Sequence, residues 1–256
     1  MQDSNDNMKR RAEALRPGIA IGPATNNQDF WGICFGRPSA YLFLVLFGGI
    51  SWITPNLLTV VSFALVIATS AIMVWGDPSL WVLAAILLQL NLTLDCADGQ
   101  LARYRKISSP LGSYLDKITD FLGFLILFAA LAELSIQRTG DLWYMHLAFL
   151  GVFAPVMVGY VKWLAVADSL KKGQSELDAA PPGPERVTWW RVVLKIVEFR
   201  EPDLYLWVGL ALCLQHPEWS LLVIGISQPL VLIVALVYRG RQLTRPSGDI
   251  KEGTGS

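Results

Sequence analysis

Charged side chains are scarce in this chain. Asp, Glu, Lys and Arg together make up 16% of its 256 residues, whereas they make up about 25% of a typical soluble domain. Hydrophobic residues make up 53%. These proportions predict a membrane protein. Because basic and acidic residues are equally numerous, at 21 each, the net charge gives no indication of a nucleic-acid partner, and we expect none.

Cysteine and histidine are also rare, which argues against several kinds of site. The three cysteines form no CxxC pair, so the sequence predicts neither a disulfide framework nor a zinc site. The two histidines, His146 and His216, lie far apart at the edges of apolar segments, which does not favour a histidine metal site or a catalytic dyad. The polar N-terminus lacks the pattern of a signal peptide, and we expect none.

Long apolar segments dominate the rest of the chain. A helix needs about 20 apolar residues to cross the hydrocarbon core of a bilayer. A further apolar stretch, 37–53, is followed by Pro55, which favours an interfacial amphipathic helix ahead of the first span. We therefore expect an all-α integral membrane protein with six transmembrane helices, at about 55–76, 79–103, 110–137, 142–169, 203–217 and 219–239.

The basic residues predict the orientation, because Lys and Arg remain on the cytoplasmic side. With six spans, the basic clusters all fall on one side, and the opposite turns contain a single Arg between them. We expect a multi-pass protein of the plasma membrane with both termini in the cytoplasm. It would have a polar cytoplasmic segment at 1–36, a membrane domain at 37–240 and a polar tail at 241–256.

Three further segments are polar or mixed in composition. The outer parts of the two tails, about 1–28 and 245–256, are predicted to be poorly ordered. The loop at about 170–202 combines a Pro-rich stretch with aromatic and basic residues. This composition predicts a helix at the lipid headgroups, with Trp189 and Trp190 as anchors.

Four aspartates gather around the turn between the second and third predicted spans. Asp95 and Asp98 are three residues apart on one helix, and Asp116 and Asp120 are four apart on the next. At about 100° per residue, each pair lies on one face of its helix. The short turn at 107–110 makes the two helices antiparallel neighbours, so the two acidic faces can meet.

Such a group of carboxylates requires cations. Ionised carboxylates repel one another, and each costs several kcal/mol to desolvate. Oxygen ligands favour Mg²⁺, Mn²⁺ or Ca²⁺ over zinc, and Mg²⁺ usually binds substrate phosphates as well. The sequence therefore predicts a divalent-metal site that also binds an anion such as pyrophosphate.

Small and basic residues accompany the acids. Gly99, Ala102 and Gly112 leave room for a ligand beside the backbone, and Arg103 can pair with a phosphate. The small residues are equally suited to close helix packing, and Arg103 to a cytoplasmic boundary. Taken singly, these residues leave both interpretations open, but their joint spacing is too specific to arise by chance.

The complete pattern resembles the signature of the CDP-alcohol phosphotransferase family at all eight of its fixed positions. The spans extend this resemblance to about residues 37–240. It implies an enzyme that moves a substituted phosphate from a CDP-alcohol to a second alcohol and releases CMP. The eight positions are Asp95, Asp98, Gly99, Ala102, Arg103, Gly112, Asp116 and Asp120.

The resemblance also implies roles for these residues. Asp95, Asp98 and Asp116 would hold two divalent cations, Mg²⁺ or Mn²⁺, against the pyrophosphate, and Asp120 would be the general base and also a possible metal ligand. Gly99, Ala102, Arg103 and Gly112 would line the nucleotide site. The segment TPNLLT is similar to a family segment near the nucleotide, which adds Asn56 and Thr59, although helix capping explains these two equally well. Homodimers are common in the family, so we expect one.

The acceptor is less well defined. Members that use phosphorylated acceptors have a basic pocket beside the metals, and the chain offers Lys117, Lys162, Lys195 and Arg200 for this purpose. Contact with lipid headgroups is the alternative role for these side chains. Phe121 stands where many inositol-phosphate-using members have Arg, which disfavours that acceptor.

We therefore expect a phospholipid-synthesising transferase, with a CDP-diacylglycerol-like lipid donor. A soluble polyol or sugar-alcohol substrate is the alternative within the same chemistry. A divalent-cation transporter is the alternative from another class, since acids inside membranes often mark ion pathways. A catalytically inactive receptor or scaffold is disfavoured because no acid of the motif is missing.

Overall fold

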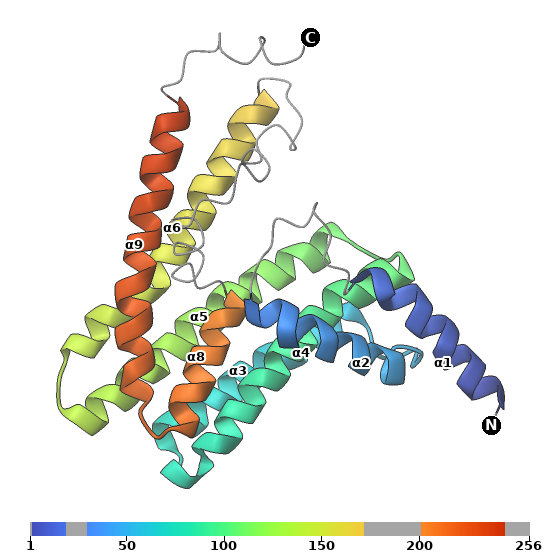
Figure 1. Cartoon of the computed structure of the whole chain (residues 1–256), viewed down its shortest axis with the longest axis horizontal. Helices are drawn as coiled ribbons and strands as arrows, with labels where there is room; N and C mark the ends of the chain where they lie inside the picture. Colours follow the sequence, from blue (N-terminus) through green and yellow to red (C-terminus); the bar gives the residue numbers. More distant parts are fainter. Residues whose placement is uncertain (1, 19–29, 172–200, 244–256) are drawn as a thin grey trace.

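A computed structural model of the chain describes residues 2–18, 30–171 and 201–243, and the described part is helical without strands (Figure 1). This agrees with the all-α prediction. The long elements, in chain order, are α1 (Gln2–Leu15), α2 (Arg37–Phe47), α3 (Pro55–Trp75), α4 (Trp81–Arg105), α5 (Pro110–Thr139), α6 (Trp143–Lys171), α8 (Glu201–Cys213) and α9 (Pro217–Leu243). A π-helical turn, Gly32–Gly36, precedes α2, and a 3₁₀ turn, Pro78–Leu80, precedes α4.

Five of the described helices are long and apolar enough to cross a membrane, namely α3, α4 with its preceding turn, α5, α6 and α9. The chain is therefore a multi-pass membrane protein. The remaining predicted span, 203–217, corresponds to α8, which has only 13 residues and is shorter than a membrane crossing requires. The predicted interfacial helix corresponds to α2, an apolar helix of 11 residues.

Helix α3 is the centre of the packing. Both α4 and α5 pack mainly against α3, and α8 packs against α4 on another side. The sequence predicted that α4 and α5 would be direct neighbours, whereas the structure joins them only by a short turn and places α3 against both. Because α3 packs closely against both helices, it keeps them from packing against each other.

Local sequence explains where these helices begin. Thr54 caps α3, because its side chain accepts a hydrogen bond from the backbone N–H of Leu57 at 3.2 Å, and Pro55 occupies the first turn. Ser109 caps α5 in the same way by accepting from the N–H of Gly112 at 3.0 Å. Lys106 ends α4 in the left-handed conformation, with φ of 55°. These caps fix the turn that connects the two halves of the acidic motif.

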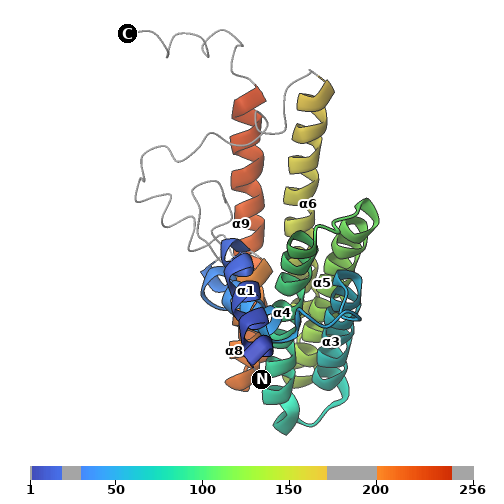
Figure 2. The ribbon, with the colours of Figure 1, turned by 90° about the vertical axis from the view of Figure 1, so that its right-hand side faces the viewer.

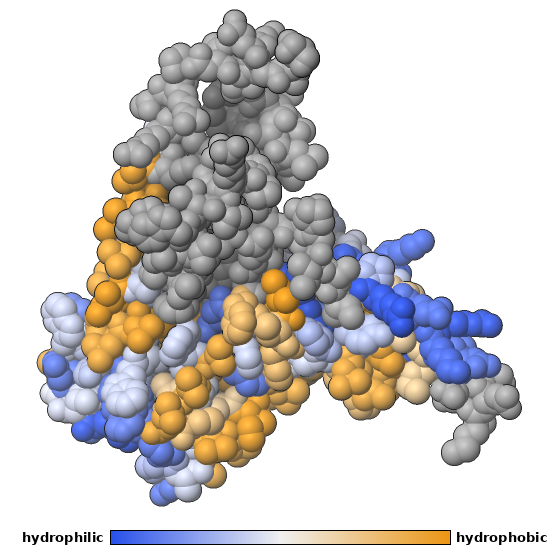
Figure 3. All heavy atoms as spheres, in the orientation of Figure 1, coloured by the Kyte–Doolittle hydropathy of each residue, from blue (hydrophilic) through white to orange (hydrophobic). Residues whose placement is uncertain are grey.

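The N-terminal segment is more ordered than its polar composition predicted. Helix α1 packs against α2, with Leu15 buried at 3% exposure. Arg11 donates to the carbonyl of Val45 at 2.9 Å, and the Tyr41 hydroxyl donates to the carbonyl of Ala12 at 3.3 Å. The prediction of poor order was therefore wrong for residues 2–15, because one apolar face suffices to dock a polar helix. Figure 2 shows α1 lying across this end of the bundle, and Figure 3 shows its hydrophilic surface.

Helices α6 and α9 lie side by side and extend beyond the rest of the bundle (Figures 1 and 2). Hydrophobic side chains cover the visible face of α9 (Figure 3), as expected for a helix that faces lipid. The predicted headgroup helix with Trp189 and Trp190, and the C-terminal tail from residue 244, lie outside the described residues.

Candidate metal and nucleotide site

Three aspartates from two helices meet in the space between α4 and α5. One carboxylate oxygen each of Asp95, Asp98 and Asp116 lies within 4.8 Å of the others. The first two residues come from α4 and the third from α5, so the acidic faces do meet as predicted. Three carboxylates at this spacing are a suitable set of ligands for hard divalent cations such as Mg²⁺ or Mn²⁺.

Asp98 is the most deeply buried of the acids, at 6% exposure. The hydroxyl of Thr59 on α3 donates to its carboxylate at 2.5 Å. This contact orients one predicted ligand and places Thr59 beside the acids, whereas the predicted nucleotide-binding role of Thr59 stays a prediction. Thr59 is itself buried, and its hydroxyl oxygen also lies 3.1 Å from the carbonyl oxygen of Pro55, an alternative acceptor for its single proton. Helix α3 thus positions Asp98 through its side chain.

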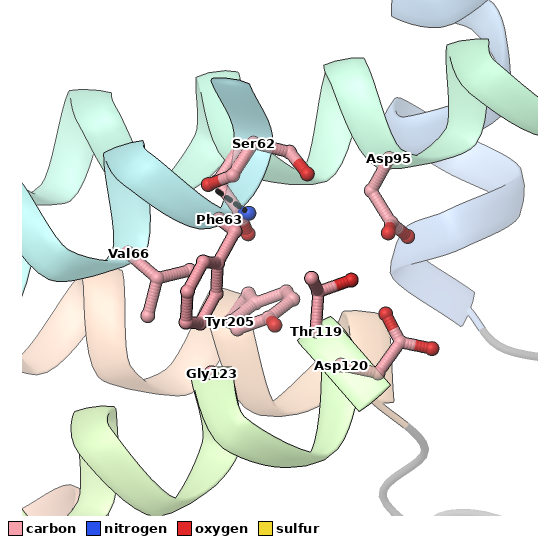
Figure 4. A pocket seen from close by; sticks show the side chains of 9 residues that line it. Ser62, Phe63, Val66, Asp95, Thr119, Asp120, Gly123 and Tyr205 are labelled. Carbon is pink, nitrogen blue, oxygen red and sulfur yellow. Dashed lines mark hydrogen bonds between the residues drawn. The ribbon is translucent and has the colours of Figure 1, made fainter. Parts of the chain in front are cut away.

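Asp120 lies beside the triad. Its carboxylate points toward that of Asp95 across the gap between the helices (Figure 4). Lys117 donates to Asp116 at 3.0 Å and to Asp120 at 3.1 Å, so the lysine links a member of the triad to the fourth acid. Lys117 is 62% exposed, which leaves it free to move when another cation or an anion arrives.

The small and basic residues of the motif lie next to one another. A Cβ atom built on Gly99 would lie 3.4 Å from Nη1 of Arg103, and one built on Gly112 would lie 3.3 Å from Oδ1 of Asn56. The guanidinium of Arg103 and the amide of Asn56 therefore lie over glycine backbone, where a bound group can approach closely. Ala102 is partly buried on the same helix as Gly99. The structure thus places Arg103 beside Gly99 and Asn56 beside Gly112, and the nucleotide-binding role of these residues stays a prediction.

Arg105 fastens this end of α4 to the chain before α3. Its guanidinium donates to the carbonyls of Gly48, Ile50 and Ile53 at 2.7 to 3.0 Å. These carbonyls lie at the end of α2 and in the turn that leads to Thr54 and Asn56. Sequence reasoning treated Arg105 as part of a basic cluster and missed this role, for which the sequence contains no specific signal.

A small pocket adjoins Asp95 and Asp120 (Figure 4). Asn91 in this pocket was missed by sequence reasoning. The available signal was an amide four residues before Asp95, one helical turn away, in an otherwise apolar run. The pocket is lined by Ser62, Phe63, Val66, Asn91, Asp95, Thr119, Asp120, Gly123 and Tyr205.

Of the residues predicted to bind the acceptor, Lys117 is at the site. Lys162 lies in α6, and its side chain is outside the described part of the chain. Lys195 and Arg200 are likewise outside the described residues. Their predicted role therefore stays a prediction.

Comparison with known proteins gives one family. The sequence profile of the CDP-alcohol phosphatidyltransferase family matches residues 52–243. The bifunctional IPC transferase and DIPP synthase of Thermococcus kodakarensis is 39% identical over 108 residues, which are 42% of this chain and 23% of that protein. Cholinephosphotransferase 1 of Xenopus laevis is 32% identical over 112 residues, 40% of this chain and 27% of that protein.

A shorter relative is matched over more of its length. The CDP-diacylglycerol–glycerol-3-phosphate 3-phosphatidyltransferase of Pseudomonas fluorescens is 30% identical over 137 residues, 53% of this chain and 63% of that protein. The matched segments thus span less than two thirds of each of these relatives. Because the family profile covers most of the chain and all eight motif residues are in place, the chain belongs to the CDP-alcohol phosphatidyltransferase family.

Proposed function

We propose that the protein transfers a substituted phosphate from a CDP-alcohol to an acceptor alcohol and releases CMP, in phospholipid biosynthesis. The observation that carries this proposal is the convergence of Asp95, Asp98 and Asp116 within 4.8 Å. Family membership and the glycines beside Arg103 and Asn56 support it. The donor is a CDP-diacylglycerol-like lipid, which suits a site built between membrane helices.

The acids bind two divalent cations, Mg²⁺ or Mn²⁺. Asp95, Asp98 and Asp116 are the ligands, and Asp120, whose carboxylate points toward that of Asp95, would add a further oxygen. When bound, the cations supply positive charge that neutralises the pyrophosphate and the CMP leaving group. Thr59 keeps Asp98 in position through its hydrogen bond.

Asp120 is the general base. The acceptor hydroxyl gives its proton to this carboxylate while its oxygen forms the new bond to phosphorus. The bond between that phosphorus and the oxygen of CMP breaks, and CMP leaves with the electron pair. No serine or histidine is needed, because the acceptor itself is the nucleophile.

The nucleotide lies at the cytoplasmic end of the acids. Arg103 pairs with phosphate oxygens, and Gly99, Ala102 and Gly112 allow the cytidine and phosphates to lie against the backbone. Asn56 and Thr59 of α3 complete this side. The contact of Arg103 with Gly99, and that of Asn56 with Gly112, support a shared site.

The acceptor binds near Lys117, with Lys162 and Arg200 as further contacts when it carries a phosphate. The contact of Lys117 with Asp120 supports the first of these. A soluble polyol or sugar alcohol is the second substrate class for the same chemistry. The assay below distinguishes it from the lipid substrates.

The protein lies in the plasma membrane with its termini and its active site in the cytoplasm, and it forms a homodimer. The basic residues at the end of α4 support this orientation. They lie at the same end of the helix as the acids, which would give soluble substrates access from the cytoplasm.

A CMP-release assay tests the function. The purified protein in nanodiscs would be given Mg²⁺ or Mn²⁺ and either CDP-diacylglycerol with soluble alcohols or soluble CDP-alcohols with lipid acceptors. We expect CMP release only with a metal, a donor and an acceptor together. Metal flux into liposomes without nucleotide, or no CMP release from any combination, would contradict the proposal.

A further inference from the structure

The pocket beside Asp95 and Asp120 is built from four helices. Helix α3 contributes Ser62, α4 Asn91, α5 Gly123 and α8 Tyr205. It is narrow, with room for about one water-sized group. The described lining contains polar and apolar side chains but no Lys or Arg. The pocket is therefore suited to a small uncharged polar group and not to a phosphate.

Asn91 lines this pocket and has a buried hydrogen-bond acceptor that is not used. Its side chain is 4% exposed. The Nδ2 atom donates to the backbone carbonyl of Ser62 at 2.9 Å, which fixes the orientation of the amide. The Oδ1 atom has no hydrogen-bond partner among the described residues. A buried acceptor without a partner costs about 1–3 kcal/mol, so a ligand that donates a hydrogen bond gains affinity here.

The location of the pocket identifies the ligand as the acceptor alcohol. Along α4, Asn91 precedes Asp95, whereas Gly99 and Arg103 follow it. Along α5, Gly123 follows Asp120, whereas Gly112 precedes it. The acids thus lie between the pocket and the nucleotide residues. In phosphoryl transfer the attacking and leaving oxygens are roughly in line, so the alcohol attacks from the pocket side.

We propose that Asn91 determines acceptor specificity by accepting a hydrogen bond from a second, uncharged hydroxyl next to the reactive one. This inference rests on the proposed function. Asp120 takes the proton of the reactive hydroxyl, and the neighbouring hydroxyl enters the pocket and donates to Oδ1 of Asn91. The favoured acceptor is a polyol with adjacent hydroxyls, and any phosphate that it carries lies outside the pocket.

The opposite wall of the pocket is held in place by a chain of contacts. Gln89, on the same helix as Asn91, donates to the carbonyl of Tyr205 at 3.0 Å and accepts from Nε1 of Trp31 at 2.7 Å. The ring of Tyr205 stacks on Phe124, with 5.7 Å between centroids. Helix α8 also approaches closely at Gly209, where a Cβ would lie 2.9 Å from Nε2 of Gln89. The pocket is therefore preorganised for a group of fixed size.

The test compares acceptors that differ only in the second hydroxyl. The full chain in nanodiscs, with Mg²⁺ and CDP-diacylglycerol, would be given matched pairs: glycerol and 1,3-propanediol, sn-glycerol 3-phosphate and 3-hydroxypropyl phosphate, and inositol 1-phosphate and its analogue lacking the neighbouring hydroxyl. We expect kcat/KM for the complete acceptor of at least one pair to exceed that of its analogue by about tenfold or more. In Asn91→Leu this ratio falls to about one.

The variants separate recognition from folding. Asn91→Leu should lower kcat/KM for the complete acceptor far more than for its analogue, whereas a general loss of structure would lower both equally. Tyr205→Phe keeps the ring and serves as a second probe of the pocket if Asn91→Leu does not fold. Thr69→Val is the matched control. Like Asn91→Leu, it removes a buried oxygen that has no hydrogen-bond partner, but Thr69 lies on α3 outside the pocket. Its selectivity should equal that of the wild type.

Several outcomes would overturn the inference. The wild type could show no preference in any pair, or the preference could survive in both pocket variants. Serine and diacylglycerol have no hydroxyl next to the reactive one. Turnover with these acceptors alone would exclude the proposed acceptor class while leaving the transferase function intact. If the wild type and Thr69→Val released CMP with no alcohol at all, the proposed function itself would fail.

Discussion

Two groups of carboxylates lie toward opposite ends of α5, and they differ in how their charge is balanced. At one end Glu218 is paired with Arg138 at 3.4 Å and with His216 at 2.9 Å. Arg138 also lies 5.0 Å from the centroid of the Trp81 ring. This group joins α4, α5 and α9, and Arg138 of the protein itself supplies the positive charge. Such a group is structural.

The other end of α5 has an excess of negative charge. Asp95, Asp98, Asp116 and Asp120 come together there, with Lys117 and Arg103 as the nearby cations. Four carboxylates with two nearby cations leave an excess of negative charge, which bound metal ions would neutralise. The comparison shows that the number of acids alone does not identify a functional site. An excess of negative charge that the protein does not balance identifies it.

The largest effect is expected from Asp120→Asn. CMP release should fall about a thousandfold, because the acceptor loses its general base. Binding of the CDP-alcohol in the presence of Mg²⁺ should change little, since the triad is intact. Turnover assays and equilibrium binding of the donor provide the two measurements. Equal losses of binding and turnover would contradict the role of base.

Asp98→Asn should act on the metal. We expect the apparent affinity for Mg²⁺ to fall by at least about tenfold, because the most deeply buried ligand loses its charge. Donor binding across a Mg²⁺ titration measures this. The increase in Tm that Mg²⁺ gives the wild type should also be reduced in the variant. Unchanged metal dependence would remove Asp98 from the ligand set.

Glu218→Gln should affect stability and not chemistry. Breaking this partly exposed pair should cost about 1–2 kcal/mol, and Tm should fall by several degrees with or without Mg²⁺. Thermal unfolding in detergent provides the measurement, and kcat should remain near that of the wild type. If the loss of Tm depended on Mg²⁺, the two groups would not be independent.

Lys117→Met should have the smallest effect. Removing a cation 3.0–3.1 Å from Asp116 and Asp120 should raise the apparent Mg²⁺ affinity by about threefold, because the exposed lysine competes only weakly. Adding salt should diminish the difference between variant and wild type. A lower Mg²⁺ affinity in the variant would show that Lys117 supports the metal site instead of competing with it.

The sequence predicted the elements that depend on local pattern. Apolar length gave the positions of α3, α4, α5, α6 and α9, and helical spacing placed the acids on two facing stripes. It did not predict that α3 would lie against both acidic helices, because packing partners are set by the whole bundle. It also missed the docking of α1 through Leu15.

The parts of the site that depend on tertiary contacts escaped prediction for the same reason. Asn91 and Tyr205 lie in largely apolar helices without a recognisable motif, and the pocket forms only when α8 meets α4. Nothing in the spacing of residue 105 indicated that its guanidinium would reach three carbonyls more than 50 positions earlier. By contrast, Thr59 could be singled out from the sequence, because the segment TPNLLT that contains it resembles a segment of the family.

The bonds made by Arg105 limit how the enzyme can open. They join the end of α4 to the end of α2 and to the entrance of α3, so that these three helices must shift together. Helix α5 has no comparable clamp to α4 in the described chain and carries Asp116 and Asp120 on its own. Asp116 and Asp120 therefore lie on a helix that the Arg105 bonds do not hold, and their distance from the acids of α4 depends instead on the packing of α5 against α3 and α6.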